Sequence, residues 1–293
     1  MKGLKLFVAA CFLAPLACAR PTSELPDIRT VPRDLVVPPV SGGNPAPGKR
    51  VVQTAPEYAG TAVHHTLYLP RDWEPGKRFP VLVEYPGNGP YSNDYGDLSS
   101  GEVEGCVMGY GLSGGAGFIW LALPFVDSET KSNQTWWWGD VEATVRYAKR
   151  AVRRVVDEFG GDPSAVVLAG FSRGAIAVNY IGLHDDEIAD LWAGFMPYSH
   201  YDGVREWNYP GSGRSDALAR LKRLRGRPSF ITHERSINET RDYLAQTEVQ
   251  APFALRAVPF RNHNAAWTLR DIPLRREARQ WLAQVVASAE ANR

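Results

Sequence analysis

The chain has 293 residues, of which 44% are hydrophobic and 22% are charged, with 27 glycines and 22 prolines. This composition is typical of a globular protein and excludes a coiled coil, a collagen and a wholly disordered chain. The 33 basic and 32 acidic side chains leave a net charge of +1. That balance argues against a nucleic-acid partner, because binding to a polyanion requires a basic stripe.

The N-terminal segment is typical of an export signal rather than of folded structure. Two lysines precede an apolar run over residues 6–16, and the small residues at 17–19 form a cleavage site. The run is too short to span a bilayer. We therefore expect a signal peptide over residues 1–19, no stable membrane span, and a secreted or periplasmic protein. A lipoprotein anchored at Cys18 is the weaker alternative, because the residues before this cysteine match a lipidation site poorly.

The rest of the chain divides into a proline-rich lead-in and one domain. Eight prolines fall within residues 20–60, which predicts an extended lead-in along the domain. After signal removal Cys106 is the one remaining cysteine, so the mature chain has no internal disulfide. We expect a single folded domain over residues 61–293.

The predicted elements alternate between strands and helices along this domain. Apolar and β-rich runs bounded by turn residues predict strands, whereas apolar residues at helical spacing predict helices. Strands are expected at Val63–Leu69, Val81–Tyr85, Phe118–Leu123, Ala165–Ala169, Trp192–Met196, Ser229–Thr232 and Phe253–Val258, and helices at Asp140–Phe159, Ser172–Leu183 and Arg275–Ala289. This order predicts an α/β fold, with a mostly parallel central sheet and helices on both faces.

A Gly-x-Ser-x-Gly motif spans Gly170–Gly174 and lies between a predicted strand and a predicted helix. On such a sharp turn the flanking residues have no room for side chains, while the serine hydroxyl is raised above the sheet edge. The helix N-terminus below it favours developing negative charge. A second copy, around Ser113, lacks a preceding strand. We therefore predict Ser172 as a nucleophile and Ser113 as a loop serine.

The stretch from Gly161-Asp162-Pro163 through a strand to Gly170–Ala175 resembles the α/β-hydrolase superfamily. The similarity covers about residues 60–290 and is closest to the secreted serine esterases, namely feruloyl esterases, acetylxylan esterases and polyester depolymerases. This resemblance implies hydrolysis of carboxylic esters through an acyl-enzyme, without a cofactor. The sequence contains no spacing typical of a metal site.

The resemblance also implies positions for the other catalytic groups. In this fold the histidine follows the last strand, which identifies His263 as the base. The oxyanion hole would use the amide of Arg173, which follows the nucleophile, and an amide of Gly87 or Asn88 in the loop after the Val81–Tyr85 strand.

The acid departs from the pattern of these esterases. The family expects an aspartate a few residues beyond the strand that ends near Thr232, and this chain has none there. Glu234 is the first candidate. Asp202, after the preceding strand, is the second, and Glu239, in a predicted helix, is the third. The acid would hold the imidazole in the correct tautomer.

Aromatic residues are frequent in the predicted loops. They are Tyr91, Tyr95, Trp136, Trp137, Trp138, Trp207, Tyr209 and Trp267. Their faces suit a sugar ring or an aromatic acyl group, or else they pack the loops together. Arg173 and Arg205 either contact an anionic substrate or pair with acidic residues.

The expected partner is a small-molecule or polysaccharide-linked ester. The alternatives are a serine peptidase or an acyltransferase on the same fold, and a non-catalytic binding protein.

Overall fold

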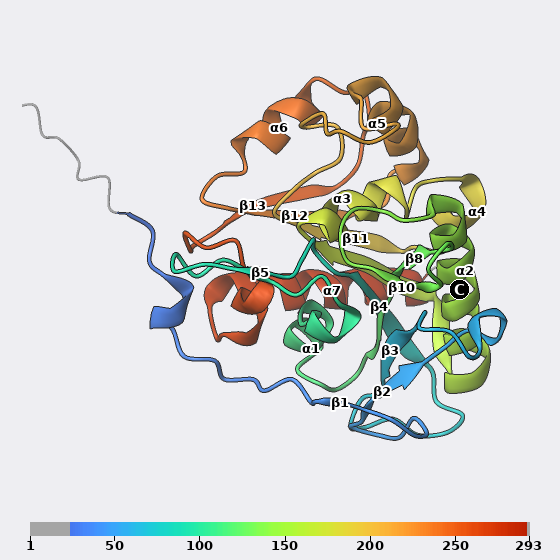
Figure 1. Cartoon of the computed structure of the whole chain (residues 1–293). Coiled ribbons are helices and arrows are strands. Elements are labelled where there is room, and N and C mark those ends of the chain that lie inside the picture. Colours follow the sequence, from blue (N-terminus) through green and yellow to red (C-terminus); the bar gives the residue numbers. More distant parts are fainter. Residues whose placement is uncertain (1–23, 292–293) are drawn as a thin grey trace, which may run out of the picture.

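A computed structural model describes residues 24–291 of the chain. The expected signal peptide, residues 1–19, lies outside these residues. The core of the structure is a nine-stranded sheet with the strand order β1-β2-β3-β7-β4-β10-β11-β12-β13 (Figure 1). Its strands are β1 (Val40–Ser41), β2 (Arg50–Gln53), β3 (His65–Tyr68), β4 (Phe79–Tyr85), β7 (Ile119–Ala122), β10 (Gly161–Phe171), β11 (Gly194–Tyr198), β12 (Ser229–Glu234) and β13 (Phe253–Val258).

The sheet is mostly parallel, which confirms the expected fold class. Every neighbouring pair is parallel except β2–β3 and β3–β7. The seven predicted strands correspond to β3, β4, β7, β10, β11, β12 and β13. Two further strands, β1 and β2, lie within residues 20–60, the segment expected to form an extended lead-in. A domain that starts at residue 61 would therefore leave two strands of the sheet outside it.

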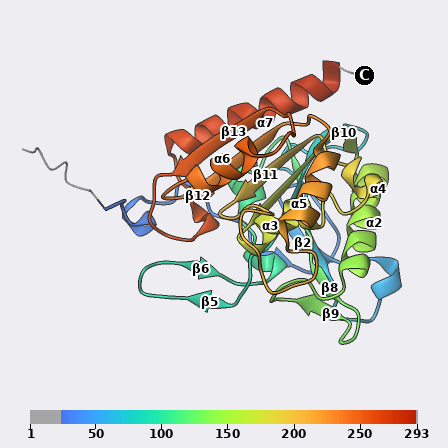
Figure 2. The same ribbon diagram turned by 90° about the horizontal axis from the view of Figure 1, so that it is seen from above.

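Helices cover both faces of the sheet (Figures 1 and 2). Alternate residues of β4 point to opposite faces, because side chains alternate along a strand. Val81 and Val83 belong to one buried cluster, together with residues of α2 (Val141–Phe159), α3 (Arg173–Tyr180) and α6 (Asn238–Ala245). Leu82 belongs to the other cluster, together with residues of α1 (Met108–Ser113), the 3-10 turn η5 (Ala265–Leu269) and α7 (Pro273–Ala291).

The helix α2 begins and ends at residues typical of helix termini. The carboxylate of Asp140 accepts a hydrogen bond from the amide of Ala143 at 2.8 Å and caps the N-terminus. Gly160 ends the helix with a φ of 73°, a left-handed conformation that glycine adopts without strain. The helices predicted at Ser172–Leu183 and Arg275–Ala289 correspond to α3 and α7, with boundaries that differ by a few residues.

Several short elements were not predicted. They are the helices α1, α4 (Asp186–Ala189) and α5 (Arg214–Leu221), and the hairpins β5 (Tyr91–Ser92) with β6 (Leu98–Ser99) and β8 (Phe125–Asp127) with β9 (Ser132–Gln134). The helix α6 was expected only as the place of Glu239, and it does contain that residue. Within residues 24–291, no helix combines the length and the apolar character needed to cross a bilayer.

Candidate active site

Ser172 lies on the turn between β10 and α3. Its backbone has φ 57° and ψ −116°, a conformation that costs energy for a residue with a side chain. The amide of Ser172 donates to the carbonyl of Tyr198 at 3.0 Å. That amide is therefore occupied, whereas the amide of Arg173, the first residue of α3, has no partner within its helix. This is the strained strand-to-helix turn that the motif predicts.

The two glycines of the motif lie where a side chain would collide with the backbone. A Cβ on Gly170 would lie 2.1 Å from the carbonyl oxygen of Gly174, and one on Gly174 would lie 2.1 Å from that of Tyr85. Both neighbours are backbone atoms of buried elements and have little freedom to move. Ser113 occupies a different setting, because it is the last residue of α1. It thus ends a helix and does not lie in a loop as expected.

The substitution Gly174→Ala is expected to destabilise the fold by about 3 kcal/mol or more, because the new methyl group overlaps the Tyr85 carbonyl. Helix propensity alone would favour alanine at this position by about 1 kcal/mol. Urea unfolding followed by circular dichroism measures the difference. Gly42→Ala is the control, because a Cβ there meets nothing within 4 Å. If Gly174→Ala unfolds at the same urea concentration as the wild type, the steric account is wrong.

The structure brings Ser172, His263 and Glu234 into one chain of hydrogen bonds. The Oγ of Ser172 lies 2.9 Å from Nε2 of His263, and Nδ1 of His263 lies 2.7 Å from Oε1 of Glu234. Burial would raise the pKa of Glu234, but its hydrogen bond and charge interaction with His263 lower the value to about 2. Glu234 is therefore ionised at neutral pH and accepts from Nδ1, which leaves Nε2 free to accept the proton of Ser172.

The other two candidates for the acid lie elsewhere. Asp202 is buried and pairs with Arg220 at 2.8 Å. Glu239 lies at the surface of α6 and pairs with Arg205 at 3.0 Å. Neither carboxylate is among the hydrogen-bond partners of His263, although Asp202 follows the strand next to Glu234. Arg205 thus pairs with an acidic residue, which was one of its two expected roles.

Ser199 joins this network and was not singled out from the sequence. Its Oγ lies 2.8 Å from Nδ1 of His263 and 3.1 Å from Oε1 of Glu234. Its φ of 91° lies outside the usual range for serine, and its amide donates to the carbonyl of Thr232. Ser199 therefore contacts the carboxylate and the imidazole together at the end of β11. The partners are 35 and 64 residues away in the sequence, so no local motif could reveal this contact.

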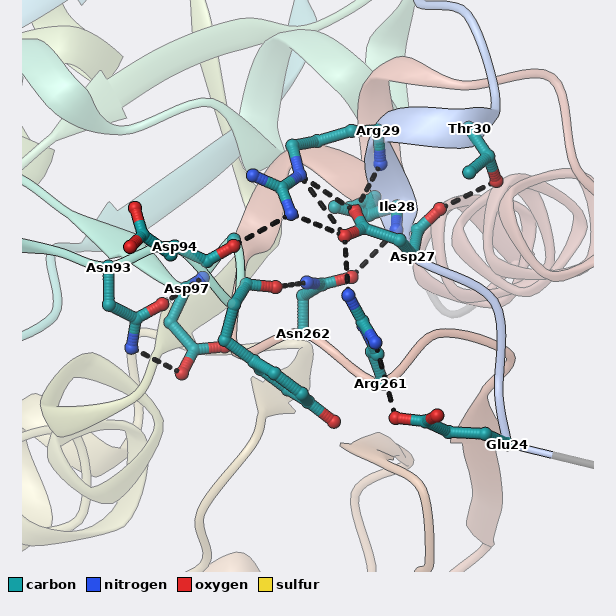
Figure 3. Close-up of polar contacts among 12 residues, drawn as sticks. Glu24, Asp27, Ile28, Arg29, Thr30, Asn93, Asp94, Asp97, Arg261 and Asn262 are labelled. Atoms are coloured by element: carbon teal, nitrogen blue, oxygen red, sulfur yellow. Dashed lines mark hydrogen bonds and ion pairs between the residues drawn. The ribbon is translucent and has the colours of Figure 1, made fainter.

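The loop that carries His263 is held from two sides. The amide of His263 donates to Oδ1 of Asp97 at 2.7 Å, and its carbonyl accepts from the amide of Leu98 at 3.1 Å. The neighbouring Asn262 is fully buried and accepts from the amide of Ile28 at 2.6 Å (Figure 3). Arg261 pairs with Asp27 at 2.9 Å. The described part of the lead-in is thus fastened to the residues that precede His263.

The loop after β4 lies directly beside the nucleophile. A Cβ on Gly87 would lie 3.1 Å from Cβ of Ser172 and 2.7 Å from Oγ of Ser99, so the backbone there is in close contact with the serine. The side-chain oxygen of Asn88 accepts from the amide of Trp137 at 2.8 Å. The amides of Gly87, Asn88 and Arg173 therefore all remain candidates for the two oxyanion donors. The side chain of Arg173 is buried and donates to backbone carbonyls, and among the described residues it forms no ion pair with an acidic residue.

A pocket of about 310 Å³ opens over Ser172 and His263. Aromatic rings form much of its wall, namely those of Tyr91, Trp136, Trp137 and Trp207, and half of the Trp136 surface is exposed. A neighbouring pocket of about 310 Å³, whose lining includes Arg205, Arg235 and Glu239, shares His200 and Trp207 with it. Burial and the nearby His263 lower the pKa of His200 to about 4, so this ring is neutral at the edge of both pockets.

The remaining loop aromatics pack against other side chains instead. Trp138 and Trp267 are almost fully buried, Tyr209 packs against Trp137 and Trp138, and Tyr95 lies against Arg235 and Arg261. The packing expectation therefore holds for this subset, whereas substrate contact by the rings that line the pocket over Ser172 stays a prediction. Among residues 24–291, no group of three or more His, Cys, Asp or Glu side chains is arranged to hold a metal ion.

Known proteins resemble this chain mainly in fold. No protein-family model matches it. Human (Homo sapiens) carboxylesterase 5A is 28% identical over 184 residues, which cover 56% of this chain. The match spans only 30% of the length of that relative.

Three solved structures have the same architecture. An acetyl ester-xyloside bifunctional hydrolase from Caldicellulosiruptor lactoaceticus is 14% identical with a TM-score of 0.55, covering 83% of this chain and 98% of that one. The feruloyl esterase module from Clostridium thermocellum, complexed with sinapinate, is 14% identical with a TM-score of 0.51, covering 86% and 94%. A structure described as a dipeptidyl aminopeptidase IV from Bacteroides ovatus is 15% identical with a TM-score of 0.54, covering 80% and 35%. At these identities the likeness is one of fold.

Proposed function

The chain has the α/β-hydrolase fold, and on this fold we propose that it is a serine hydrolase that cleaves carboxylic esters. The observation that carries the proposal is the unbroken relay from Ser172 through His263 to Glu234, with contacts of 2.9 and 2.7 Å. The relay starts on the strained turn of a Gly-x-Ser-x-Gly motif, where such a hydroxyl is exposed to a substrate.

In the proposed mechanism, Nε2 of His263 removes the proton of Ser172 as Oγ attacks the ester carbonyl. The carbonyl oxygen becomes an oxyanion, which the amides of Asn88 and Arg173 stabilise. His263 then returns the proton to the leaving alcohol, and an acyl-enzyme remains on Ser172. Water then attacks this acyl-enzyme while His263 removes its proton. His263 passes the proton to Oγ of Ser172 as the carboxylic acid leaves. Glu234 stays ionised throughout and stabilises the imidazolium.

The pocket over the nucleophile supports a proposal for the substrate class. Exposed indole faces, such as that of Trp136, stack on flat or ring-shaped groups. The pocket next to it carries polar side chains, such as Arg235 and Ser236, that can bond to a hydroxylated group. We therefore propose an ester between an acyl group and a carbohydrate or similar alcohol. The pattern over residues 1–19 supports export of a catalytic domain that follows a signal peptide.

Covalent labelling tests this function directly. A fluorophosphonate reacts with an activated serine, so we expect it to label the wild-type protein at Ser172, as mapped by peptide mass spectrometry. The Ser172→Ala variant, which keeps the surrounding backbone, should remain unlabelled. Labelling of a different serine, or none in the folded wild type, would refute the proposal.

A matched pair of substrates separates ester hydrolysis from peptide hydrolysis. We expect turnover of p-nitrophenyl acetate but no turnover of p-nitroacetanilide, which differs only in having an amide at the scissile bond. Release of p-nitroaniline from a dipeptide anilide would instead support a peptidase. Absence of both turnover and labelling would support a non-catalytic binding protein.

A further inference from the structure

Arg173, the residue that follows the nucleophile, carries a buried guanidinium group whose hydrogen bonds all go to the backbone. The residue is 1% exposed. Its Nη2 donates to the carbonyl of Gly87 at 2.9 Å, and its Nη1 donates to that of Trp137 at 2.5 Å. Longer bonds run to the carbonyls of Gly101 and Gln134. Among the described residues no carboxylate forms an ion pair with Arg173, and Glu102 acts on it only through a charge interaction without direct contact, although a buried charge without a close partner is costly.

The cation is held in place by aromatic and main-chain dipoles instead. Its guanidinium lies 4.0 Å from the centre of the Phe125 ring, a favourable cation–π arrangement. Burial lowers the pKa of Arg173 to about 9, so the group remains protonated at neutral pH.

The contact with Gly87 is the informative one, because that carbonyl belongs to the peptide unit between Gly87 and Asn88. This peptide is trans, since the one cis bond in residues 24–291 is Gly89–Pro90. A trans peptide is planar, and its C=O and N–H groups point in opposite directions. A donor that holds the Gly87 oxygen therefore fixes the direction of the Asn88 amide.

We propose that the Arg173 side chain is a positioning residue for the oxyanion hole, in which it orients the Gly87–Asn88 peptide so that the Asn88 amide points at the oxyanion. This inference rests on the proposed serine hydrolase function. Arg173 then contributes to the oxyanion hole in two ways, because its side chain orients one donor and its own main-chain amide is the other donor. A cation bonded to the carbonyl also polarises the peptide and strengthens donation by its N–H.

Two further hydrogen bonds join the loop after β4 to residues 135–137, which Arg173 also contacts. The amide of Trp137 donates to the side-chain oxygen of Asn88 at 2.8 Å, and the amide of Gly89 donates to the carbonyl of Thr135 at 3.0 Å. Arg173 thus bridges two loops that are already joined to each other, so its removal should tilt one peptide without releasing the whole loop.

The experiment compares Arg173→Met with the wild type. It measures kcat and KM for p-nitrophenyl acetate and the inhibition constant of an alkyl trifluoromethyl ketone. The ketone forms a tetrahedral adduct with the serine, and the oxyanion of that adduct occupies the hole. We expect kcat to fall about 100-fold, KM to change less than about 3-fold, and the affinity for the ketone to fall about as much as kcat, as on loss of one oxyanion donor.

Arg227→Met is the matched control. The Arg227 guanidinium also bonds only to backbone carbonyls, those of Leu224, Ala189, Trp192 and Arg223, and lies over the Phe195 ring. It precedes β12 at the opposite end of that strand from Glu234. This variant should lose stability but keep the kcat and the ketone affinity of the wild type.

Each outcome bears on the inference. A folded Arg173→Met protein with unchanged kcat and ketone affinity would overturn it, and so would a change confined to KM, which would indicate direct substrate contact. Should Arg173→Met fail to fold, Arg173→Lys keeps the buried charge with a less extended set of donors. In that variant kcat and ketone affinity must fall together if the inference is correct. A wild type with neither turnover nor labelling would refute the proposed function itself.

Discussion

Replacing Ser172 or His263 with alanine is expected to lower kcat for ester hydrolysis by about 10⁴-fold or more. The Oγ of Ser172 and Nε2 of His263 are 2.9 Å apart, so each group depends on the other for the first step. Residues that act as a unit have non-additive effects. We therefore expect the double variant Ser172→Ala/His263→Ala to lose no more activity than either single variant. Steady-state kinetics with p-nitrophenyl acetate measures all three.

His184→Ala serves as the control for loss of an imidazole. His184 follows α3 and lies near Glu142 and Asp185, away from the pocket over the nucleophile. Its replacement should leave kcat within about 2-fold of the wild type. If instead the losses at Ser172 and His263 multiply in the double variant, the two residues act independently and the proposed relay is wrong.

The parts of the site that the sequence predicts are those with local signals. The turn around Ser172 depends on contacts within the motif and with the adjacent strand β4, and its glycines reveal it. The position of His263 is predicted from the order of the elements, because it lies between the last strand, β13, and the final helix, α7. In both cases the element order, which hydrophobic periodicity indicates well, determines the position.

The acid could not be decided from the sequence because three carboxylates lie at plausible positions after two neighbouring strands. What separates them is their long-range partner. Arg220 neutralises Asp202, and Arg205 pairs with Glu239, which leaves Glu234 for His263. Pairs between side chains far apart in the chain leave no periodic pattern in the sequence, so the sequence alone does not identify the acid.

The side chain of Arg173 is the clearest case of a role hidden from the sequence. The residue was expected to supply an amide, and its side chain was expected to meet a substrate or an acidic residue. Its main partners, Gly87 and Trp137, are 86 and 36 residues away and offer backbone carbonyls, which every residue possesses. The strand β2 is also defined by a contact between distant segments, so the sequence does not predict it. It is four residues long within a proline-rich segment, and its pairing with β3 is what identifies it.

The Glu234→Gln variant is expected to lose about 10³- to 10⁴-fold in kcat, because an amide neither stabilises the imidazolium nor selects the same tautomer. The other two carboxylates provide matched controls. Asp202→Asn breaks a buried pair and should cost about 3–5 kcal/mol in stability while kcat of the folded protein is kept. Glu239→Gln breaks an exposed pair and should change neither quantity appreciably. A large loss of kcat in Asp202→Asn, with Glu234→Gln active, would reverse the assignment.

The same variant tests the electrostatic basis of the assignment through the pH dependence of stability. Interaction with His263 lowers the pKa of Glu234 from 4.5 to about 2 on folding, against the opposing effect of burial. The ionised carboxylate therefore stabilises the native state fully above about pH 4.5, and this contribution is lost as the pH falls towards 2. Glu234→Gln lacks it at every pH. The difference in unfolding free energy between wild type and variant, measured by urea titration at pH 6, 4 and 3, should accordingly shrink at the lower values. A difference that stays constant over this range would mean that the carboxylate gains nothing from the imidazole beside it.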